Sequence, residues 1–94
     1  MKEEKQILRT EIFSGKFGNF FVSTMKRRSS GMLDTFGMYY ETLAWGMNDK
    51  NERENIVADN SGALTGIRAE EQHFEVCRQL RTTGEFKENF NEED

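Results

Sequence analysis

Two side chains with the chemistry of catalysts and metal ligands, His73 and Cys77, stand four residues apart. On a helix this spacing places them on one face. A general base is usually oriented by a partner group, and structural zinc takes four nitrogen or sulfur ligands. The chain holds one histidine and one cysteine, so the pair supplies at most half of a metal site. We therefore predict no metal site: Cys77 packs as a small apolar side chain, and His73 flanks the buried stripe of a helix.

Other reactive residue types form no catalytic motif. No serine lies in a Gly-x-Ser-x-Gly nucleophile elbow, and no second histidine could complete a triad. Glu11 and Glu41 fall on neighbouring predicted strands and could form a carboxylate pair. Because acidic residues number 17 in this chain, ion pairing with Arg9 or Arg27 is the favoured role for these carboxylates. The sequence predicts no catalytic residue, no cofactor and a protein that is not an enzyme.

A cationic cluster and the apolar connection that follows it form the predicted partner-binding site. The cluster could bind a phosphate or be a phosphorylation site, or it could simply be the solvated end of a hairpin. Loops run over the surface, so the apolar residues of the connection either form a lid on the core or expose an adaptable patch. Both alternatives stay open. The predicted partner-binding residues are Lys26, Arg27, Arg28, Met32, Leu33, Phe36 and Met38.

Aromatic and alternating apolar residues predict the strands that must position these groups. Residues 6–13, 19–26 and 39–47 are predicted strands, and residues 55–59 are a short fourth strand that ends at Asn60-Ser61-Gly62. The strand over residues 19–26 is apolar on both faces near its start, which is typical of a central strand. Gly15 and Gly18 supply the positive φ angles that a hairpin loop over residues 14–18 needs.

The periodicity becomes helical from about Thr65. Gly84 is placed as the left-handed stop of the helix, and Phe86 could fold back on its last turn. The predicted buried stripe of this helix consists of Ile67, Phe74, Cys77 and Leu80, with Glu70 as a polar exception.

These elements predict an α+β fold, with an antiparallel sheet of three to four strands and one C-terminal amphipathic helix packed on one face. The predicted organisation is a frayed start over residues 1–5, a single domain over residues 6–84 and an acidic, disordered tail over residues 85–94.

Charge and composition limit the function classes. The net charge is −4 and the isoelectric point is near 5.1, so a global attraction to nucleic acid or to an anionic membrane is not expected. No apolar run approaches the ~20 residues that span a bilayer. A single cysteine is compatible with a reducing compartment. We therefore expect a cytoplasmic protein without a membrane association.

Two segments resemble stretches found in small uncharacterised proteins of bacterial viruses. They are Gly18-Asn19-Phe20-Phe21-Val22-Ser23-Thr24 and Tyr39-Tyr40-Glu41-Thr42-Leu43-Ala44-Trp45. The resemblance covers roughly the middle third of the chain and brings no catalytic or binding residues with it. It implies a viral accessory protein in the cytoplasm of a bacterial host, where such proteins commonly bind and inhibit a host protein.

The leading functional hypothesis is a non-enzymatic interaction protein, a viral inhibitor that docks on a host protein. The alternative is a small-ligand or single-stranded nucleic-acid binder, with Phe20, Tyr40 and Trp45 as stacking residues on a sheet face and the basic cluster at its rim. A sheet with a helix on one side leaves an aromatic face open, so we also predict a homodimer that pairs these faces or the edge strands.

Overall fold

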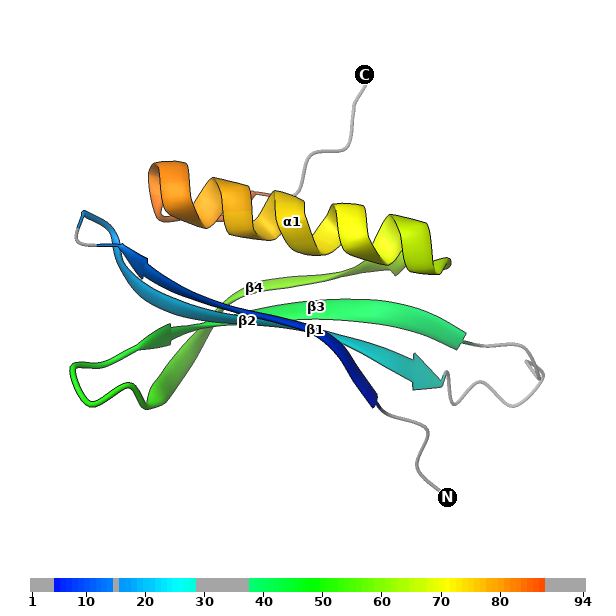
Figure 1. The fold of residues 1–94 in the computed structure, drawn as a ribbon, viewed down its shortest axis with the longest axis horizontal. Helices are drawn as coiled ribbons and strands as arrows, with labels where there is room; N and C mark the ends of the chain where they lie inside the picture. Colours follow the sequence, from blue (N-terminus) through cyan, green and yellow to red (C-terminus); the bar gives the residue numbers. More distant parts are fainter. Residues whose placement is uncertain (1–4, 15, 29–37, 88–94) are drawn as a thin grey trace.

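The structure is a computed structural model that describes residues 5–14, 16–28 and 38–87. In these ranges the chain forms strands β1 (Lys5–Ser14), β2 (Gly18–Arg28), β3 (Met38–Met47) and β4 (Arg53–Ala63), followed by helix α1 (Gly66–Thr83). The strands form one antiparallel sheet in the order β1-β2-β3-β4, so each pairs with its neighbour in the sequence (Figure 1). The predicted α+β class, with an antiparallel sheet and a C-terminal helix, is confirmed.

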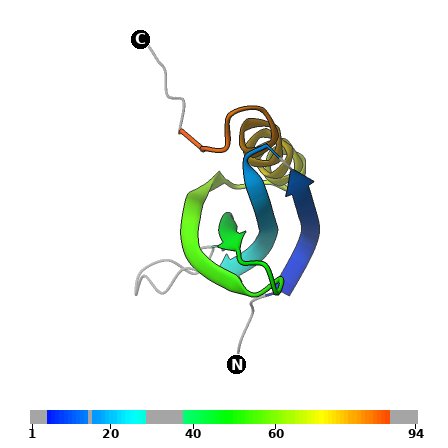
Figure 2. The same ribbon diagram turned by 90° about the vertical axis from the view of Figure 1, so that its left-hand side faces the viewer.

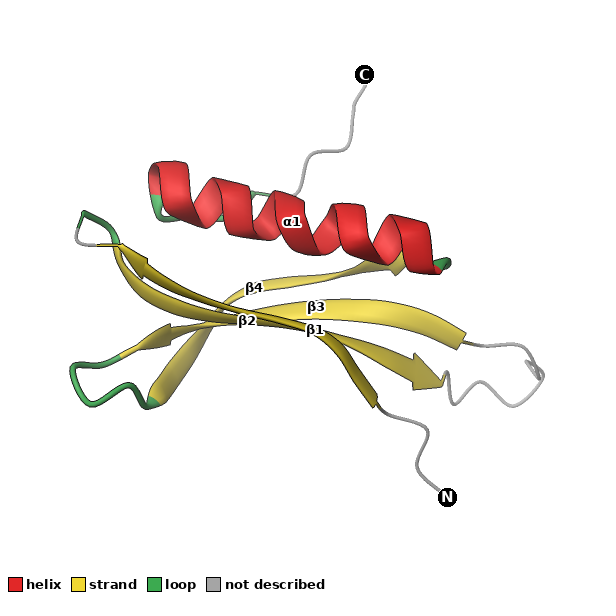
Figure 3. Cartoon of the chain, in the orientation of Figure 1, coloured by secondary structure: helices red, strands yellow, loops and turns green. Residues whose placement is uncertain are grey.

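The sheet is twisted and curved, with β1 and β4 as its edge strands, and α1 lies alongside it (Figure 2). Strand β2 is central, as its two apolar faces predict. The tight connection between β1 and β2 ends at Gly18, whose φ of 102° lies in the region that glycine tolerates best. Short connections also join β3 to β4 and β4 to α1 (Figure 3).

Strand β4 is longer than predicted. The prediction that it ends at Asn60-Ser61-Gly62 is wrong, because pairing with β3 continues to Ala63, opposite Tyr40. Two side chains make this extension possible by accepting hydrogen bonds from backbone donors. Asn60 Oδ1 accepts from Gly62 N at 3.2 Å, and Gln72 Oε1 accepts from Ala63 N at 3.1 Å.

The core lies between α1 and alternate residues of the four strands. Since successive strand residues point to opposite faces, every second residue contributes to it. Phe17, Val57 and Phe86 pack against its margin. The buried cluster consists of Ile12, Phe20, Val22, Ala44, Ala58, Val76, Cys77 and Leu80.

Both ends of α1 carry capping residues. Thr65 Oγ1 accepts from Arg68 N at 3.2 Å at the start. At the end, Gly84 adopts the left-handed conformation with φ 78°, and its N–H donates to Leu80 O. The predicted stop at Gly84 is therefore confirmed. No helix within the described ranges is both long and apolar enough to cross a membrane.

The predicted buried stripe of α1 is partly wrong. Ile67 is 73 % exposed and Phe74 is 56 % exposed, whereas the buried residues are Ala69, His73, Val76, Cys77 and Leu80. The physical reason is a row of threonines on the sheet, which needs polar partners from the helix. The helix is rotated so that a histidine and a glutamine, rather than a phenylalanine, meet this row.

A continuous chain of hydrogen bonds joins α1 to the sheet. His73 bonds Thr24 Oγ1 through Nδ1 and Thr10 Oγ1 through Nε2, both at 2.8 Å. Thr24 Oγ1 lies 2.6 Å from Thr42 Oγ1, which accepts from Gln72 Nε2 at 2.9 Å. Because Gln72 also accepts from Ala63 N, this network contacts every strand. His73 is therefore a central residue of the core and does not flank it.

Candidate functional site

Two aromatic rings lie side by side on the sheet. Phe21 of β2 is the direct cross-strand partner of Trp45 of β3, with ring centroids 5.7 Å apart and planes inclined by 42°. Both residues alternate with core residues such as Phe20 and Ala44, so they lie on the other face of the sheet, where Phe21 is only 9 % exposed. Cross-strand aromatic pairs of this kind stabilise a sheet.

Arginines from both edge strands lie over these rings. The Cζ atom of Arg9 lies 5.2 Å from the centroid of Phe21, and that of Arg53 lies 5.0 Å from the same ring. Arg53 also lies over Trp45, at 4.8 Å. A guanidinium group over an aromatic ring is attracted by the ring, and its N–H groups can still donate hydrogen bonds to other partners. We call Arg9, Phe21, Trp45 and Arg53 the aromatic–arginine surface.

Some of the charged groups around this surface have a bonding partner among the described residues, and others have none. Arg9 Nη2 bonds Glu11 Oε2 at 2.8 Å, and Glu52 Oε1 accepts from Asn48 Nδ2 at 3.0 Å. Arg53, in contrast, forms no ion pair with another residue that the structure describes. An exposed arginine that aromatic rings hold in place, with no carboxylate partner, is available to an external acidic group.

A pocket of about 450 Å³ opens beside the two arginines. Exposed apolar side chains extend the surface, since Phe13 is 61 % exposed and Ile56, the cross-strand partner of Trp45, is 55 % exposed. The pocket is lined by Gln6, Arg9, Glu11, Phe21, Met47, Asn51, Glu52 and Arg53. Here a partner could contact both apolar groups and charged donors.

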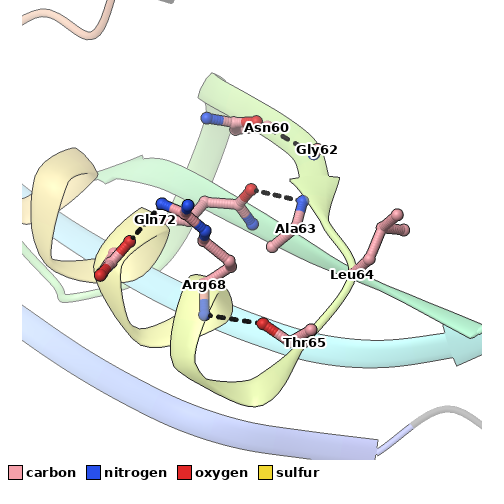
Figure 4. Close-up of a pocket in the computed structure, with 8 residues that line it drawn as sticks. Asn60, Gly62, Ala63, Leu64, Thr65, Arg68 and Gln72 are labelled. Carbon is pink, nitrogen blue, oxygen red and sulfur yellow. Dashed lines mark hydrogen bonds and ion pairs between the residues drawn. The ribbon is translucent and has the colours of Figure 1, made fainter.

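A second pocket, of about 680 Å³, lies where β4 leads into α1 (Figure 4). Its polar groups already bond one another. Arg68 Nη1 donates to Glu71 Oε1 at 3.0 Å, and Gln72 and Asn60 accept from the backbone N–H groups at the end of β4. This pocket therefore offers a ligand fewer free donors than the aromatic–arginine surface does.

The described members of the predicted partner-binding site, Lys26–Arg28 and Met38, lie toward the end of β3 that is distant from Trp45. Arg27 forms an ion pair with Glu41 at 2.6 Å, which is the pairing that the sequence favours for this carboxylate. In the strand register, Lys26 lies opposite Tyr40, and Arg28 lies opposite Met38 at the start of β3. Met32, Leu33 and Phe36 lie outside the described residues.

The three aromatic residues of the alternative hypothesis do not come together on one face. Phe20 is only 6 % exposed and belongs to the core. Tyr40 shares its face with Thr42 and Ala44 by alternation, and Trp45 points the other way. Trp45 is thus the member of this set that lies on the aromatic–arginine surface.

The structure places His73 and Cys77 in the interior. Burial lowers the pKa of His73 to about 4, and burial raises the pKa of the Cys77 thiol, against a smaller opposite effect of its bond to Thr10. Both groups are therefore held in their neutral forms at neutral pH. Among the described residues, no group of three or more histidine, cysteine, aspartate or glutamate side chains could hold a metal ion.

Sequence reasoning missed Arg9, Phe21 and Arg53 as site residues. Alternation in the two predicted strands could have placed Phe21 on the face opposite that of Phe20, but the pairing with Trp45 requires the strand register. Arg53 falls between the predicted strands over residues 39–47 and 55–59, whereas in the structure it is a strand residue because β4 begins there. The chain matches no protein-family model, and comparisons with curated protein sequences and with solved structures give no match.

Proposed function

We propose that this chain is a small non-enzymatic interaction protein, which binds another protein through the aromatic–arginine surface while α1 closes the opposite face of the sheet. Following the resemblance to proteins of bacterial viruses, we propose that it is an accessory protein that inhibits a host protein in the bacterial cytoplasm. The observation that carries the proposed binding mode is Arg53, which lies over Phe21 and Trp45 without a carboxylate partner among the described residues.

The chemistry of the surface defines the partner. Tryptophan and arginine are the residue types that most often dominate binding energy in protein interfaces. Arg53 and Arg9 would accept a carboxylate, while the exposed Phe13 and Ile56 would contact apolar groups beside it. The partner segment is therefore an acidic one with neighbouring apolar side chains. In the same proposal, the cluster Lys26–Arg28 at the far end of the sheet steers and orients the complex, and Met38 adds an apolar contact.

The alternative is a single-stranded nucleic-acid or small-ligand binder. Trp45 and Arg53 would serve it too, because bases stack on aromatic rings and on guanidinium groups. Two carboxylates beside the pocket, Glu11 and Glu52, and the net charge of −4 oppose a phosphate backbone. A labelled oligonucleotide that fails to bind at about 50 mM salt, where phosphate contacts are strong, excludes nucleic-acid binding.

The test of the proposal is a charge reversal at Arg53. For a partner protein captured with the original chain, Arg53→Glu should weaken binding by roughly 30-fold or more, as loss of about 2 kcal/mol at a hot spot implies. The matched control is Arg68→Glu, since Arg68 is also exposed and basic but lies on α1 and pairs with Glu71. Thermal denaturation should give nearly the same melting temperature for both variants.

The fluorescence of Trp45 reports directly on whether a partner occupies the same site. It is the single tryptophan of the chain, so its fluorescence should change when a partner covers the aromatic–arginine surface. A partner that binds both variants with unchanged affinity and leaves the Trp45 emission unchanged would show that the interface lies elsewhere, and the proposed binding mode would be abandoned.

A further inference from the structure

Helix α1 exposes two large apolar side chains toward solvent. Ile67 and Phe74 stand seven residues apart, which on an α-helix is two turns along the same line. Both are more than half exposed, and the other large apolar residues of the helix face the core. Phe74 also lies at the middle of the helix, which runs over residues 66–83.

The charges on either side of Phe74 have opposite signs. Glu70 and Glu71 flank it on the N-terminal side, and Arg78 and Arg81 flank it on the C-terminal side. Glu71 pairs with Arg68 and Arg78 pairs with Glu75. Glu70 and Arg81 form no ion pair with any residue in the described ranges. With Arg68 and Glu75 included, the first half of the helix has a small net negative charge and the second half a small net positive charge, which come from Glu70 and Arg81.

We propose that α1 packs antiparallel against α1 of a second copy of this chain, about a twofold axis at Phe74. In that arrangement the two Phe74 rings meet, and Glu70 of each copy faces the Arg78–Arg81 turn of the other. Ile67 meets the aliphatic stem of Arg81, which can cover apolar surface. The helix dipoles run in opposite directions, and each contact occurs twice by symmetry. A parallel arrangement would place like charges together.

This self-association is weak and depends on salt. Two helices of 18 residues are each roughly 27 Å long and meet along one stripe. Such a contact is smaller than a standard protein interface, so we expect a dissociation constant of roughly 10⁻⁵ to 10⁻³ M. The ion pairs are exposed, and added salt should raise this constant. The proposal does not depend on the aromatic–arginine surface.

The first experiment is sedimentation of the full chain over a range of concentrations. Phe74→Ser should raise the dimer dissociation constant by roughly tenfold or more, as loss of a buried aromatic contact implies. Its melting temperature should fall only slightly for the dilute protein, because the Phe74 ring also contacts His73 edge to face, with ring centroids 5.5 Å apart. The matched control is Phe13→Ser, which removes an equally exposed ring from β1 and should leave the dimer intact. A dimer that survives Phe74→Ser, or that Phe13→Ser abolishes, overturns the proposal.

The second experiment tests the antiparallel register by exchanging charges. Glu70→Arg and Arg81→Glu, each alone, should weaken the homodimer, because each creates like-charged contacts across the axis. An equimolar mixture of the two variants should associate better than either variant alone, because the arginine introduced at position 70 of one copy then faces the carboxylate introduced at position 81 of the other. If the mixture associates no better than either variant alone, or the original chain sediments at about 11 kDa even near 1 mM, the proposal is wrong.

Discussion

At the scale of single residues, the protonation state of His73 determines whether the hydrogen bonds between α1 and the sheet can all form. All hydrogen bonds of this network can form at once with one assignment of donors and acceptors. Gln72 donates to Thr42, Thr42 donates to Thr24, Thr24 donates to Nδ1 of His73, and Nε2–H of His73 donates to Thr10. A neutral imidazole can accept one bond and donate the other. A cationic imidazole donates at both nitrogens, so Nδ1–H would donate to Thr24 and Thr24 would donate to Thr42. The Thr42 hydroxyl would then have no acceptor in this network.

This requirement gives a pH dependence of stability. The pKa of His73 is about 4 in the folded protein against 6.5 as its ordinary value, so the unfolded chain binds more protons between these pH values. The contribution of neutral His73 to the free energy of unfolding is therefore fully present above about pH 6.5 and decreases as the pH drops toward 4. Urea unfolding should show a loss of about 2 kcal/mol between pH 7 and pH 5. In His73→Leu this slope should disappear, although the variant is less stable throughout; an unchanged slope would assign it to other groups.

At the scale of elements, Gly84 fixes how α1 ends and what it meets. Its φ of 78° is unfavourable for other residues, and a Cβ atom there would come within 3.0 Å of the Phe17 ring. We expect Gly84→Ala to destabilise the protein by roughly 1–2 kcal/mol in urea unfolding. Gly66→Ala is the control: nothing lies within 4 Å of its Cβ position, so it should be neutral or slightly stabilising. Equal effects of both substitutions would contradict this account.

The elements themselves could be predicted because their signals are local. Alternation marked each strand, glycine marked the turn at Gly18, and Thr65 and Gly84 marked the helix ends. The rotation of α1 could not be predicted in this way. It depends on Thr10, Thr24 and Thr42, which meet only when β1, β2 and β3 pair, and a search for large apolar residues selects Phe74 over His73. The candidate site escaped prediction for the same reason, since Arg9 and Arg53 are distant in the sequence.

At the scale of the whole molecule, the two proposed binding surfaces belong to different elements, because the aromatic–arginine surface is built from strand residues and the exposed apolar stripe from α1. We propose that one surface can bind a partner while the other binds a second copy. Two linked sites bind a dense array of partner molecules more tightly than one site does. We expect Phe74→Ser to leave the affinity for a partner in dilute solution unchanged and to speed dissociation from a densely coated surface. Equal dissociation rates at high and low partner density would argue against a bivalent assembly.

The strand order β1-β2-β3-β4 also has a kinetic consequence. Each strand finds its partner in the adjacent stretch of chain, so only short loops must close before pairing begins, and sheets of this kind fold faster than sheets with distant pairings. The sequence contains no proline, which removes the isomerisation that delays many proteins by about 10–100 s. Stopped-flow refolding followed by Trp45 fluorescence should therefore be complete within about a second in a single phase. Any slower phase should depend on protein concentration, because the joining of two copies is the remaining slow event.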